Sequence, residues 1–268
     1  MGGAPLISFV MLTWNSSRAI GETMDGIERA MPDNRAAGYE VIVVDNGSTD
    51  ATLRILEDYV KRMPLEVIRL AGNMGTTYPR NLALKKARGR YICVMDSDVV
   101  IKKWPVEASL RFVDENACLL APRLVYPGGA VQNSVKRFPT LTAKLLKLTK
   151  IFLGVKRLAY LDFYEDMPFA ETRAVDCAIS AFWLFPASLL DAVGMLDEKI
   201  FYSPEDVDWC IRVWKAGHRV YYYPLIEAVH YTQQISHKNP LSKVAFSHLF
   251  GLLYYFRKHG YYFRAPRF

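Results

Sequence analysis

Two carboxylates stand two residues apart at Asp96 and Asp98, directly after the apolar run Tyr91–Met95. A hard divalent cation binds one or two carboxylates and completes its shell with the phosphates of a substrate. The pair could therefore hold such a cation against a phosphate-bearing ligand. Acidic residues are also common in solvated loops at strand ends, so the motif alone leaves both interpretations open.

A second acidic cluster, Glu205-Asp206-Val207-Asp208, follows Pro204. Proline favours the first turn of a helix, and the helix macrodipole favours negative charge in that turn. This structural explanation accounts for acidic residues at these positions in general. A carboxylate held at a helix start and facing a cleft is also a suitable general base.

Four other residues each have a functional and a structural interpretation. Asp45 ends an apolar run, where a carboxylate can accept hydrogen bonds from a base or a ribose, or cap the next helix. The ring of Trp14 could stack on a nucleobase or pack in the core. Arg80 could pair with a phosphate or be a plain surface charge, and His230 could bind a metal or be a structural histidine.

The elements that must position these residues alternate in the first hundred residues, where apolar runs typical of strands separate amphipathic patterns typical of helices. We expect strands at Leu6–Thr13, Glu40–Asp45, Leu65–Leu70 and Tyr91–Met95, and helices at Arg18–Met31, from a cap at Ser48 or Thr49 through Tyr59, and at Pro79–Ala87. This alternation predicts an α/β fold with a Rossmann-like, mostly parallel central sheet flanked by helices. Ligands bind beyond the carboxyl ends of the strands in such sheets, and three of these ends carry the polar groups Thr13-Trp14-Asn15, Asp45-Asn46-Gly47 and Asp96-Ser97-Asp98.

The second half of the chain is less regular. We expect helices at Val106–Asp114, Glu205–Ala216 and about Leu241–Lys258, and strands at Cys118–Val125, Ala178–Phe185 and Arg219–Tyr223. Residues 136–158 form a basic, leucine-rich insertion.

The net charge of +7 is unevenly distributed along the 268 residues. Eight basic residues and no acidic residue lie between Asn116 and Tyr160, and six more, again without an acid, lie between Ala228 and Phe268. Outside these stretches, the chain has 20 of its 34 basic residues and all 27 of its acidic residues. A local excess of this kind indicates a surface that meets anions.

The first basic stretch contains a helical pattern over Thr140–Leu153 that places Leu141, Leu145, Leu148 and Phe152 on one face, with lysines beside it. Such a helix can lie in a membrane interface, or it can dock on the body of the protein with its lysines in solvent. The aromatic, basic C-terminal segment repeats this composition. We therefore expect peripheral contact with an anionic membrane, which would suit a lipid-linked acceptor.

Several classes of protein are disfavoured. The sequence has no apolar run of about 18 residues that could span a membrane and no basic region of a signal peptide. Four separated cysteines without a CxxC pair predict free core thiols in a reducing cytosol. The motifs HExxH and GxSxG, a P-loop and a glycine-rich dinucleotide turn are missing. We expect a cytoplasmic location at the inner face of the membrane.

From Leu6 to about Tyr231 the sequence resembles the nucleotide-sugar glycosyltransferases of family 2, which have the GT-A fold. The resemblance depends on an ordered set of segments: LTWNSS (12–17), VIVVDNGSTD (41–50), GNMGTTYPRN (72–81), GRYICVMDSD (89–98) and VGMLDEKIFYSPEDVDWCIRVWKAGHRVYYYP (193–224). The last segment is similar to rhamnosyltransferase-like, non-processive members. The QxxRW motif and the membrane spans of processive synthases are not found.

The resemblance implies an inverting, metal-dependent transfer of a sugar from a nucleotide-diphosphate donor to a glycan or lipid-linked acceptor hydroxyl, in cell-surface polysaccharide or glycolipid assembly. It implies one continuous GT-A domain with a donor-binding half at residues 1–125 and an acceptor-side half at residues 126–268. Trp14 would stack on the base, Asp45 would read it, and Thr13, Asn15, Asn73, Arg80 and Ser97 would also contact the donor nucleotide. Asp96, Asp98 and His230 would bind Mg²⁺ or Mn²⁺, and Asp206, with Glu205 beside it, would be the catalytic base.

One departure concerns the acceptor pocket, because relatives often have a small glycine-rich turn where Ser180-Ala181-Phe182-Trp183 stands. Two alternatives stay open. A nucleotidyltransferase would release pyrophosphate, but it should show a glycine-rich phosphate loop near the N-terminus. A non-enzymatic anion-binding module would bind polyanions with strong salt dependence, but the aromatic residues are not arranged as in an RNA-binding signature, and we expect no nucleic-acid partner.

Overall fold

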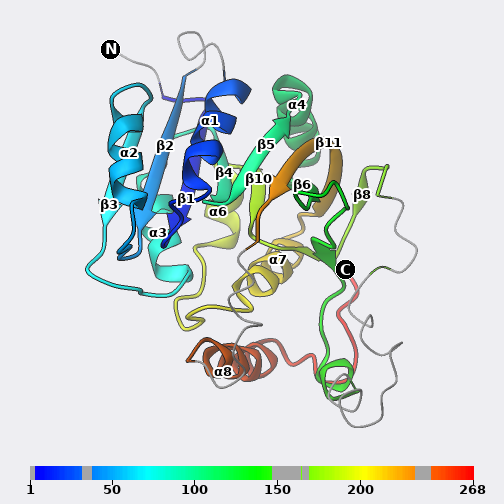
Figure 1. Cartoon of the computed structure of the whole chain (residues 1–268). Helices are drawn as coiled ribbons and strands as arrows, with labels where there is room; N and C mark the ends of the chain where they lie inside the picture. The colour runs from blue at the N-terminus through cyan, green and yellow to red at the C-terminus, as the bar shows by residue number, and fades with distance from the viewer. Residues whose placement is uncertain (1–3, 32–37, 147–163, 165–168, 233–242) are drawn as a thin grey trace.

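The computed structural model describes residues 4–31, 38–146, 164, 169–232 and 243–268. Its N-terminal part contains strands β1 (Ile7–Thr13), β2 (Tyr39–Asp45), β3 (Leu65–Arg69) and β4 (Tyr91–Asp96), which run parallel in the order β3-β2-β1-β4. Helices α1 (Ile20–Ala30), α2 (Thr52–Val60) and α3 (Thr77–Lys86) connect these strands (Figure 1). The predicted strands and helices of this half are confirmed, apart from the start of α2.

The sheet continues beyond β4 with strands of mixed direction. These are β5 (Val99–Lys103), β6 (Leu119–Val125), β8 (Arg173–Ala174), β10 (Phe182–Pro186) and β11 (Val220–His230). The order continues as β4-β10-β6-β11-β5, β8 pairs with β11, and β10 runs antiparallel to both of its neighbours. Strand β5, which sequence patterns did not predict, pairs with the end of β11 so that Val99 lies opposite His230. This pairing brings the turn that contains Asp98 next to His230.

The apolar residues of the parallel strands alternate between two cores, one on each face of the sheet. Phe9 and Met11 of β1 pack in one core with α1, α2 and α4 (Val106–Asn116), whereas Val10 packs in the other. The second core also contains residues of α3, α6 (Ala187–Val193), α7 (Glu205–Lys215) and α8 (Lys243–His259). Because helices cover both faces, the strands read as continuous apolar runs. The predicted α/β class is confirmed.

Three local predictions were wrong. Helix α2 begins at Thr52 rather than at a Ser48 or Thr49 cap, because the side chain of Asp50 accepts the hydrogen bond from the Thr52 amide at 3.0 Å. The predicted strand Ala178–Phe185 is divided, since β9 (Cys177–Ala178) pairs with β7 (Val135–Lys136) in a separate small sheet and only β10 joins the main one.

The third concerns β11, which continues past Pro224 to His230. Its register shifts between Tyr223 and Glu227, and such an irregularity lets a strand accommodate a proline that cannot donate to the ladder.

Helix α8 packs closely against the start of α7. A Cβ atom on Gly251 would lie 2.1 Å from the carbonyl oxygen of Ser203, so only glycine fits at this contact. Tyr255 and Phe256 of α8 are buried in the second core. The predicted C-terminal helix is confirmed.

A buried ion cluster fastens α8 to α7. The carboxylate of Asp208, which is fully buried, lies 3.0 Å from Nε of Arg212, 2.7 Å from Nζ of Lys258 and 2.8 Å from Nε2 of His259. Although burial opposes ionisation, the hydrogen bond from His259 and the charges of Arg212 and Lys258 lower the pKa of Asp208 to about 2. Asp208 therefore has a structural role.

The basic insertion is described only in part. Residues 141–146 are helical, Leu141 packs on the second core, and Leu145 is exposed. The remainder of the predicted helix, with Leu148 and Phe152, lies outside the described residues. Within the described parts of the chain, no helix is both long and apolar enough to cross a bilayer. All four cysteines are free and buried, as predicted.

Candidate active site

The carboxyl ends of β1, β2 and β4 meet at one edge of the sheet. The register places Thr13 beside Asp45 and Leu12 beside Asp96. Three of the predicted polar strand ends therefore lie side by side, where an α/β sheet binds ligands.

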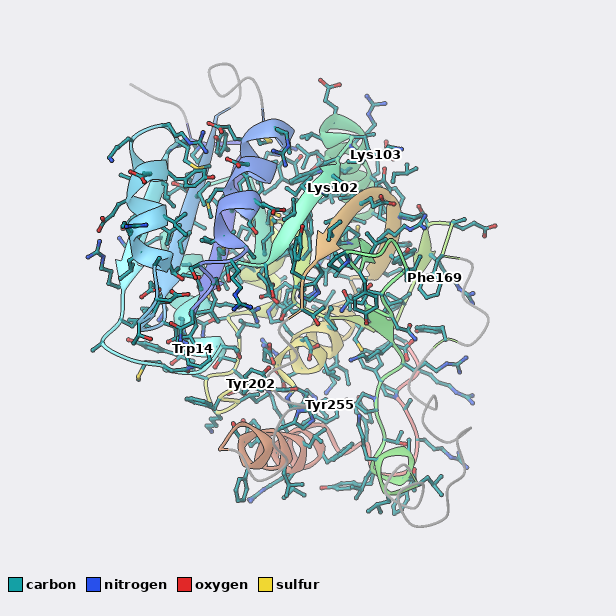
Figure 2. The ribbon with its side chains drawn as sticks, in the orientation of Figure 1. Trp14, Lys102, Lys103, Phe169, Tyr202 and Tyr255 are labelled. Carbon is teal, nitrogen blue, oxygen red and sulfur yellow. The ribbon has the colours of Figure 1, made fainter. Side chains whose placement is uncertain are left out.

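Thr13 and Asp45 carry polar atoms without partners at this edge. Both residues are almost completely buried, at 0% and 1% exposure. One carboxylate oxygen of Asp45 accepts a hydrogen bond from the Ser48 amide at 3.0 Å, but Oδ1 of Asp45 and Oγ1 of Thr13 have no hydrogen-bond partner among the described residues. A buried polar atom left unpaired costs about 1–3 kcal/mol, so a ligand that bonded these atoms would relieve this cost. Trp14 follows Thr13 and is partly exposed (Figure 2).

Asn15 and Asn73 shape the loops around this edge. Asn15 has a left-handed backbone (φ 50°), and its side-chain oxygen accepts a hydrogen bond from the Thr49 amide at 2.8 Å. The side-chain oxygen of Asn73 accepts hydrogen bonds from Nδ2 of Asn46 at 3.2 Å and from the Gly75 amide at 2.9 Å. Their predicted contact with a donor nucleotide stays a prediction.

Asp96, Asp98 and His230 form a cluster in which one potential ligand atom from each residue lies within 4.8 Å of the others. Nε2 of His230 lies 3.5 Å from Oδ1 of Asp98, and Nδ1 of the same ring lies 2.9 Å from Oε1 of Gln132. Gln132 thus holds the ring so that Nε2 faces the carboxylates, as outer partners of metal-binding histidines do. Two carboxylates and an imidazole suit Mn²⁺ and can also serve Mg²⁺.

The electrostatics of the cluster favour a bound cation. Desolvation raises the pKa of Asp96, and the charge of Asp98 adds to this effect against the opposing charge of Arg80. Burial lowers the pKa of His230, but the hydrogen bond and charge of Asp98 outweigh it, so the net pKa lies above the ordinary value. Both shifts show negative charge concentrated in a partly desolvated space, which a divalent cation would neutralise.

Arg80 joins this cluster to the start of α7. Its guanidinium is buried, with Nη2 bonded to Asp96 and Nη1 lying 3.0 Å from Oε1 of Glu205 and 2.8 Å from Oγ of Ser180. The side chain is therefore held by protein groups on both sides, and Nε alone lacks a partner among the described residues. Its predicted pairing with a phosphate stays a prediction.

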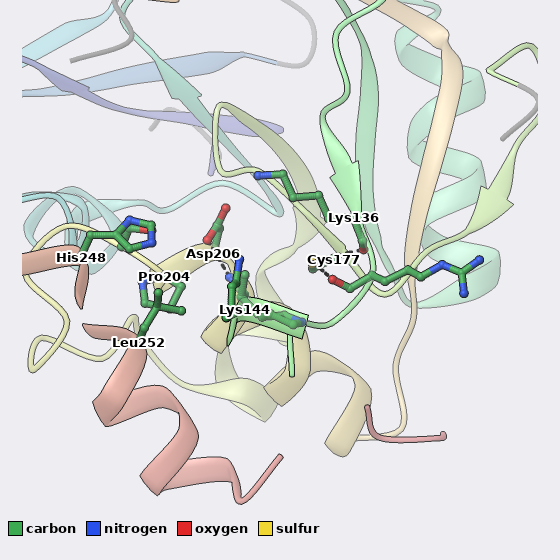
Figure 3. A pocket seen from close by; sticks show the side chains of 11 residues that line it. Lys136, Lys144, Cys177, Pro204, Asp206, His248 and Leu252 are labelled. Atoms are coloured by element: carbon green, nitrogen blue, oxygen red, sulfur yellow. Dashed lines mark hydrogen bonds between the residues drawn. The ribbon is translucent and has the colours of Figure 1, made fainter. Parts of the chain in front are cut away.

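Glu205 and Asp206 differ in their surroundings although they are neighbours. Glu205 is buried and bonded to Arg80, and its burial, together with the charge of Asp206, raises its pKa above the ordinary value. Asp206 is half-buried, and Oδ1 accepts a hydrogen bond from the Val207 amide at 2.8 Å. Asp206 lines a pocket (Figure 3). Of the two carboxylates, only that of Asp206 is thus placed to meet a ligand in this pocket.

Ser97, Ser180 and Gln132 complete the site. The side chain of Ser97 is buried against Ser16, with 2.7 Å between the two hydroxyl oxygens. Ser180 lies in the segment where the sequence departs from the family pattern, and it bonds both Arg80 and Glu205. Sequence reasoning missed Ser180 and Gln132 as site residues, because a single serine or glutamine in a loop carries no spacing signal.

Comparison with known proteins gives a consistent result. Residues 8–194 match the family model described as Glycosyl transferase family 2. The poly(ribitol-phosphate) β-N-acetylglucosaminyltransferase TarS of Staphylococcus aureus is 38% identical over 110 residues, which is 41% of this chain and 19% of TarS. The pre-mycofactocin glycosyltransferase of Mycobacterium tuberculosis is 30% identical over 207 residues, which is 76% of this chain and 40% of the relative. The chain thus spans less than half the length of these curated relatives.

Solved structures share the fold. TarS residues 1–349 in complex with UDP-GlcNAc superpose with a TM-score of 0.58 and 24% identity, covering 88% of this chain and 62% of that one. GalNAc-T7 with UDP, GalNAc and Mn²⁺ gives a TM-score of 0.62 at 13% identity, covering 90% of this chain and 46% of the other. These matches confirm the predicted GT-A fold class.

Proposed function

The chain belongs to glycosyl transferase family 2, and from this premise we propose that it transfers a sugar from a nucleotide-diphosphate donor to an acceptor hydroxyl. One observation carries the proposal. Arg80 bonds both Asp96, in the candidate metal cluster, and Glu205, the neighbour of Asp206. Through these bonds the candidate metal cluster, which would hold the leaving diphosphate, and the candidate general base would be fixed to each other, as a transfer reaction requires.

The donor would bind at the ends of β1 and β2. Oδ1 of Asp45 and Oγ1 of Thr13 are the unpartnered buried atoms that a nucleobase could bond, and the partly exposed ring of Trp14 could stack on the base. A uridine diphosphate sugar is the first donor to test, since the TarS structures that share this fold contain UDP or UDP-GlcNAc.

Asp96, Asp98 and His230 would hold the divalent cation, with Gln132 orienting the histidine. Bound there, Mg²⁺ or Mn²⁺ would supply positive charge to the diphosphate leaving group. Arg80 would keep the Asp96 carboxylate in place beside this charge.

Asp206 would act as the general base. It would accept the proton of the acceptor hydroxyl while the hydroxyl oxygen attacks the anomeric carbon, and the bond from that carbon to the diphosphate oxygen would break with release of the nucleoside diphosphate. Because attack and departure occur on opposite faces of one carbon, the anomeric configuration would invert. General-base help is typically worth about 10²–10⁴-fold.

The process served would be the assembly of a cell-surface polysaccharide or glycolipid. Membrane contact would come from α8, where Leu249, Phe250 and Leu253 are exposed, and from Phe263 in the tail, which is 79% exposed. Basic residues follow these apolar groups, so an anionic bilayer is the surface that they fit. Co-sedimentation with anionic vesicles should fall when Phe250 and Leu253 are both changed to serine, and unchanged binding would remove this part of the proposal.

A donor panel tests the proposed reaction. UDP-, dTDP- and GDP-sugars are incubated with the protein, with and without EDTA, and the products are separated. Release of a nucleoside diphosphate that requires Mg²⁺ or Mn²⁺ supports transfer. In a parallel assay that supplies a nucleoside triphosphate and a sugar 1-phosphate, release of pyrophosphate would indicate a nucleotidyltransferase instead. No turnover of any nucleotide sugar would argue against the proposal.

A further inference from the structure

The pocket beside Asp206 has several charged side chains in its lining. Its described lining includes the basic side chains of Lys136, Arg137 and Lys144, whereas Asp206 is its one acidic side chain. Figure 3 shows Lys136, Lys144 and His248 around the Asp206 carboxylate. The described lining therefore has more basic than acidic side chains.

The fold builds this pocket from both acid-free stretches of the chain. Lys136 lies on β7, which pairs with β9, and Lys144 lies in the short helix at residues 141–146. His248 lies on α8, in the second basic stretch. The amide of Thr142 donates to the carbonyl oxygen of Tyr262 at 3.1 Å, so the two stretches contact each other directly. Three basic residues of the first acid-free stretch, Lys136, Arg137 and Lys144, thus lie in the lining beside the candidate base.

The three basic side chains differ in their chemistry. The guanidinium of Arg137 is planar and lies over the ring of Tyr164, 5.2 Å from its centroid. The ammonium groups of Lys136 and Lys144 are point charges that can bond oxygens lying in several directions, as a phosphate presents them. An acceptor with only neutral hydroxyls would use none of this charge.

Resting on the proposed glycosyl transfer, we propose that the acceptor carries a phosphate group close to the hydroxyl that is glycosylated. Lys136 and Lys144 bind this phosphate and so bring the neighbouring hydroxyl to Asp206. The chemistry is shared by a polyol-phosphate polymer and by a phosphate-linked lipid, and the experiment below separates these two sources.

Binding of sn-glycerol 3-phosphate, the simplest probe with a phosphate beside hydroxyl groups, is measured by calorimetry on protein saturated with UDP and Mn²⁺. Saturation fills the donor phosphate subsites, so that only the acceptor side is titrated. We expect glycerol 3-phosphate to bind more tightly than glycerol, and Lys136→Gln and Lys144→Gln each to weaken its binding about tenfold, as the loss of a charged hydrogen bond does. Lys102 is an exposed lysine on β5 (Figure 2) that is not part of the pocket lining, so Lys102→Gln is the matched control and should bind normally.

A further variant reports on the same pocket without removing a lysine. Asp206→Asn removes the one negative charge among the described lining residues, so it should strengthen glycerol 3-phosphate binding several-fold, whereas a purely structural role of Asp206 would weaken it. Equal binding of glycerol and glycerol 3-phosphate, or binding that neither lysine substitution changes, overturns the proposal.

Two separate measurements identify the source of the phosphate and test the proposed reaction. A soluble glycerol-phosphate oligomer and dodecyl phosphate are compared as ligands, each against Lys136→Gln, and the one whose binding depends on Lys136 identifies polymer or lipid. Nucleotide-sugar turnover by the unaltered protein is assayed in the same preparation. Turnover without lysine-dependent phosphate binding refutes only this inference, whereas the lack of turnover refutes the proposed function itself.

Discussion

Replacing Arg80 with methionine tests whether one guanidinium holds the two halves of the site together. Methionine fills similar space but removes the bonds to Asp96, Glu205 and Ser180. The side chains of Arg80 and Glu205 are 4% and 8% exposed, so water cannot replace the lost partner at Glu205. The side chain of Asp96 is 31% exposed and is partly accessible to water.

The expected change in the free energy of unfolding follows from the burial of these side chains. Removing one partner of a buried ion pair typically costs about 3–5 kcal/mol. Because burial already raises the pKa of Glu205, this residue can take up a proton when Arg80 is lost, which limits the penalty. We therefore expect Arg80→Met to lower the free energy of unfolding by about 3 kcal/mol, at the lower end of that range.

Urea unfolding measures this loss. Arg90→Met is the matched control, because Arg90 pairs with Asp114 on the surface and its side chain is 67% exposed, so this change should cost less than about 1 kcal/mol. Adding Glu205→Gln to Arg80→Met should restore about 1 kcal/mol, since neighbouring residues couple by roughly that amount. Equal stability of the two single arginine variants would refute the reasoning.

Other predictions concern the elements that support the site. The pKa of Asp208 is lowered from 3.8 to about 2. The charged form of Asp208 should therefore add about 2 kcal/mol to the free energy of unfolding above about pH 4, and this contribution should be lost as the pH falls toward 2. Acid unfolding of Asp208→Asn should lack the contribution. Gly251→Ala should destabilise the protein by about 1–3 kcal/mol in urea, because its Cβ would meet the Ser203 carbonyl at 2.1 Å, and an unchanged midpoint would contradict the close packing of α8. His230→Ala and Gln132→Ala should both weaken Mn²⁺ binding, the latter by about tenfold; calorimetry that showed unchanged Mn²⁺ affinity in both would remove His230 from the metal cluster.

The parallel half of the fold could be predicted because local pattern and global position agree there. The runs that end at Thr13, Asp45 and Asp96 are apolar and short, and helical patterns separate them, so a parallel sheet with aligned carboxyl ends is the expected arrangement. The register then places Thr13 beside Asp45. The candidate donor side of the site could therefore be predicted from local sequence patterns.

The other features of the fold and of the candidate site depend on contacts between residues far apart in the chain. The approach of His230 to Asp98 requires β11 to pair with β5, and no periodicity in β5 indicates this pairing. The burial of Arg80 between two carboxylates depends on where α7 is placed. The division of the predicted strand Ala178–Phe185 depends on a second sheet formed with Val135 and Lys136. Tertiary pairing of this kind is not expressed in the spacing of apolar residues.

The charge distribution is an intermediate case. The two acid-free stretches could be counted in the sequence, but their meeting through Thr142 and Tyr262 could not. Lys136, Arg137 and Lys144 of the first stretch line the pocket beside Asp206, so part of the local basic excess lies at the proposed acceptor pocket.

The most direct test of the account is the rate of sugar transfer by Asp206→Asn. Asp206 is half-buried at the start of α7, and its carboxylate lines the proposed acceptor pocket, so the amide should leave the fold and UDP binding intact while removing the proposed proton acceptor. With the donor that the panel identifies, we predict a loss of transfer of about 10²–10⁴-fold, with unchanged UDP affinity by calorimetry. A folded Asp206→Asn protein that transferred sugar at the unaltered rate would contradict the account.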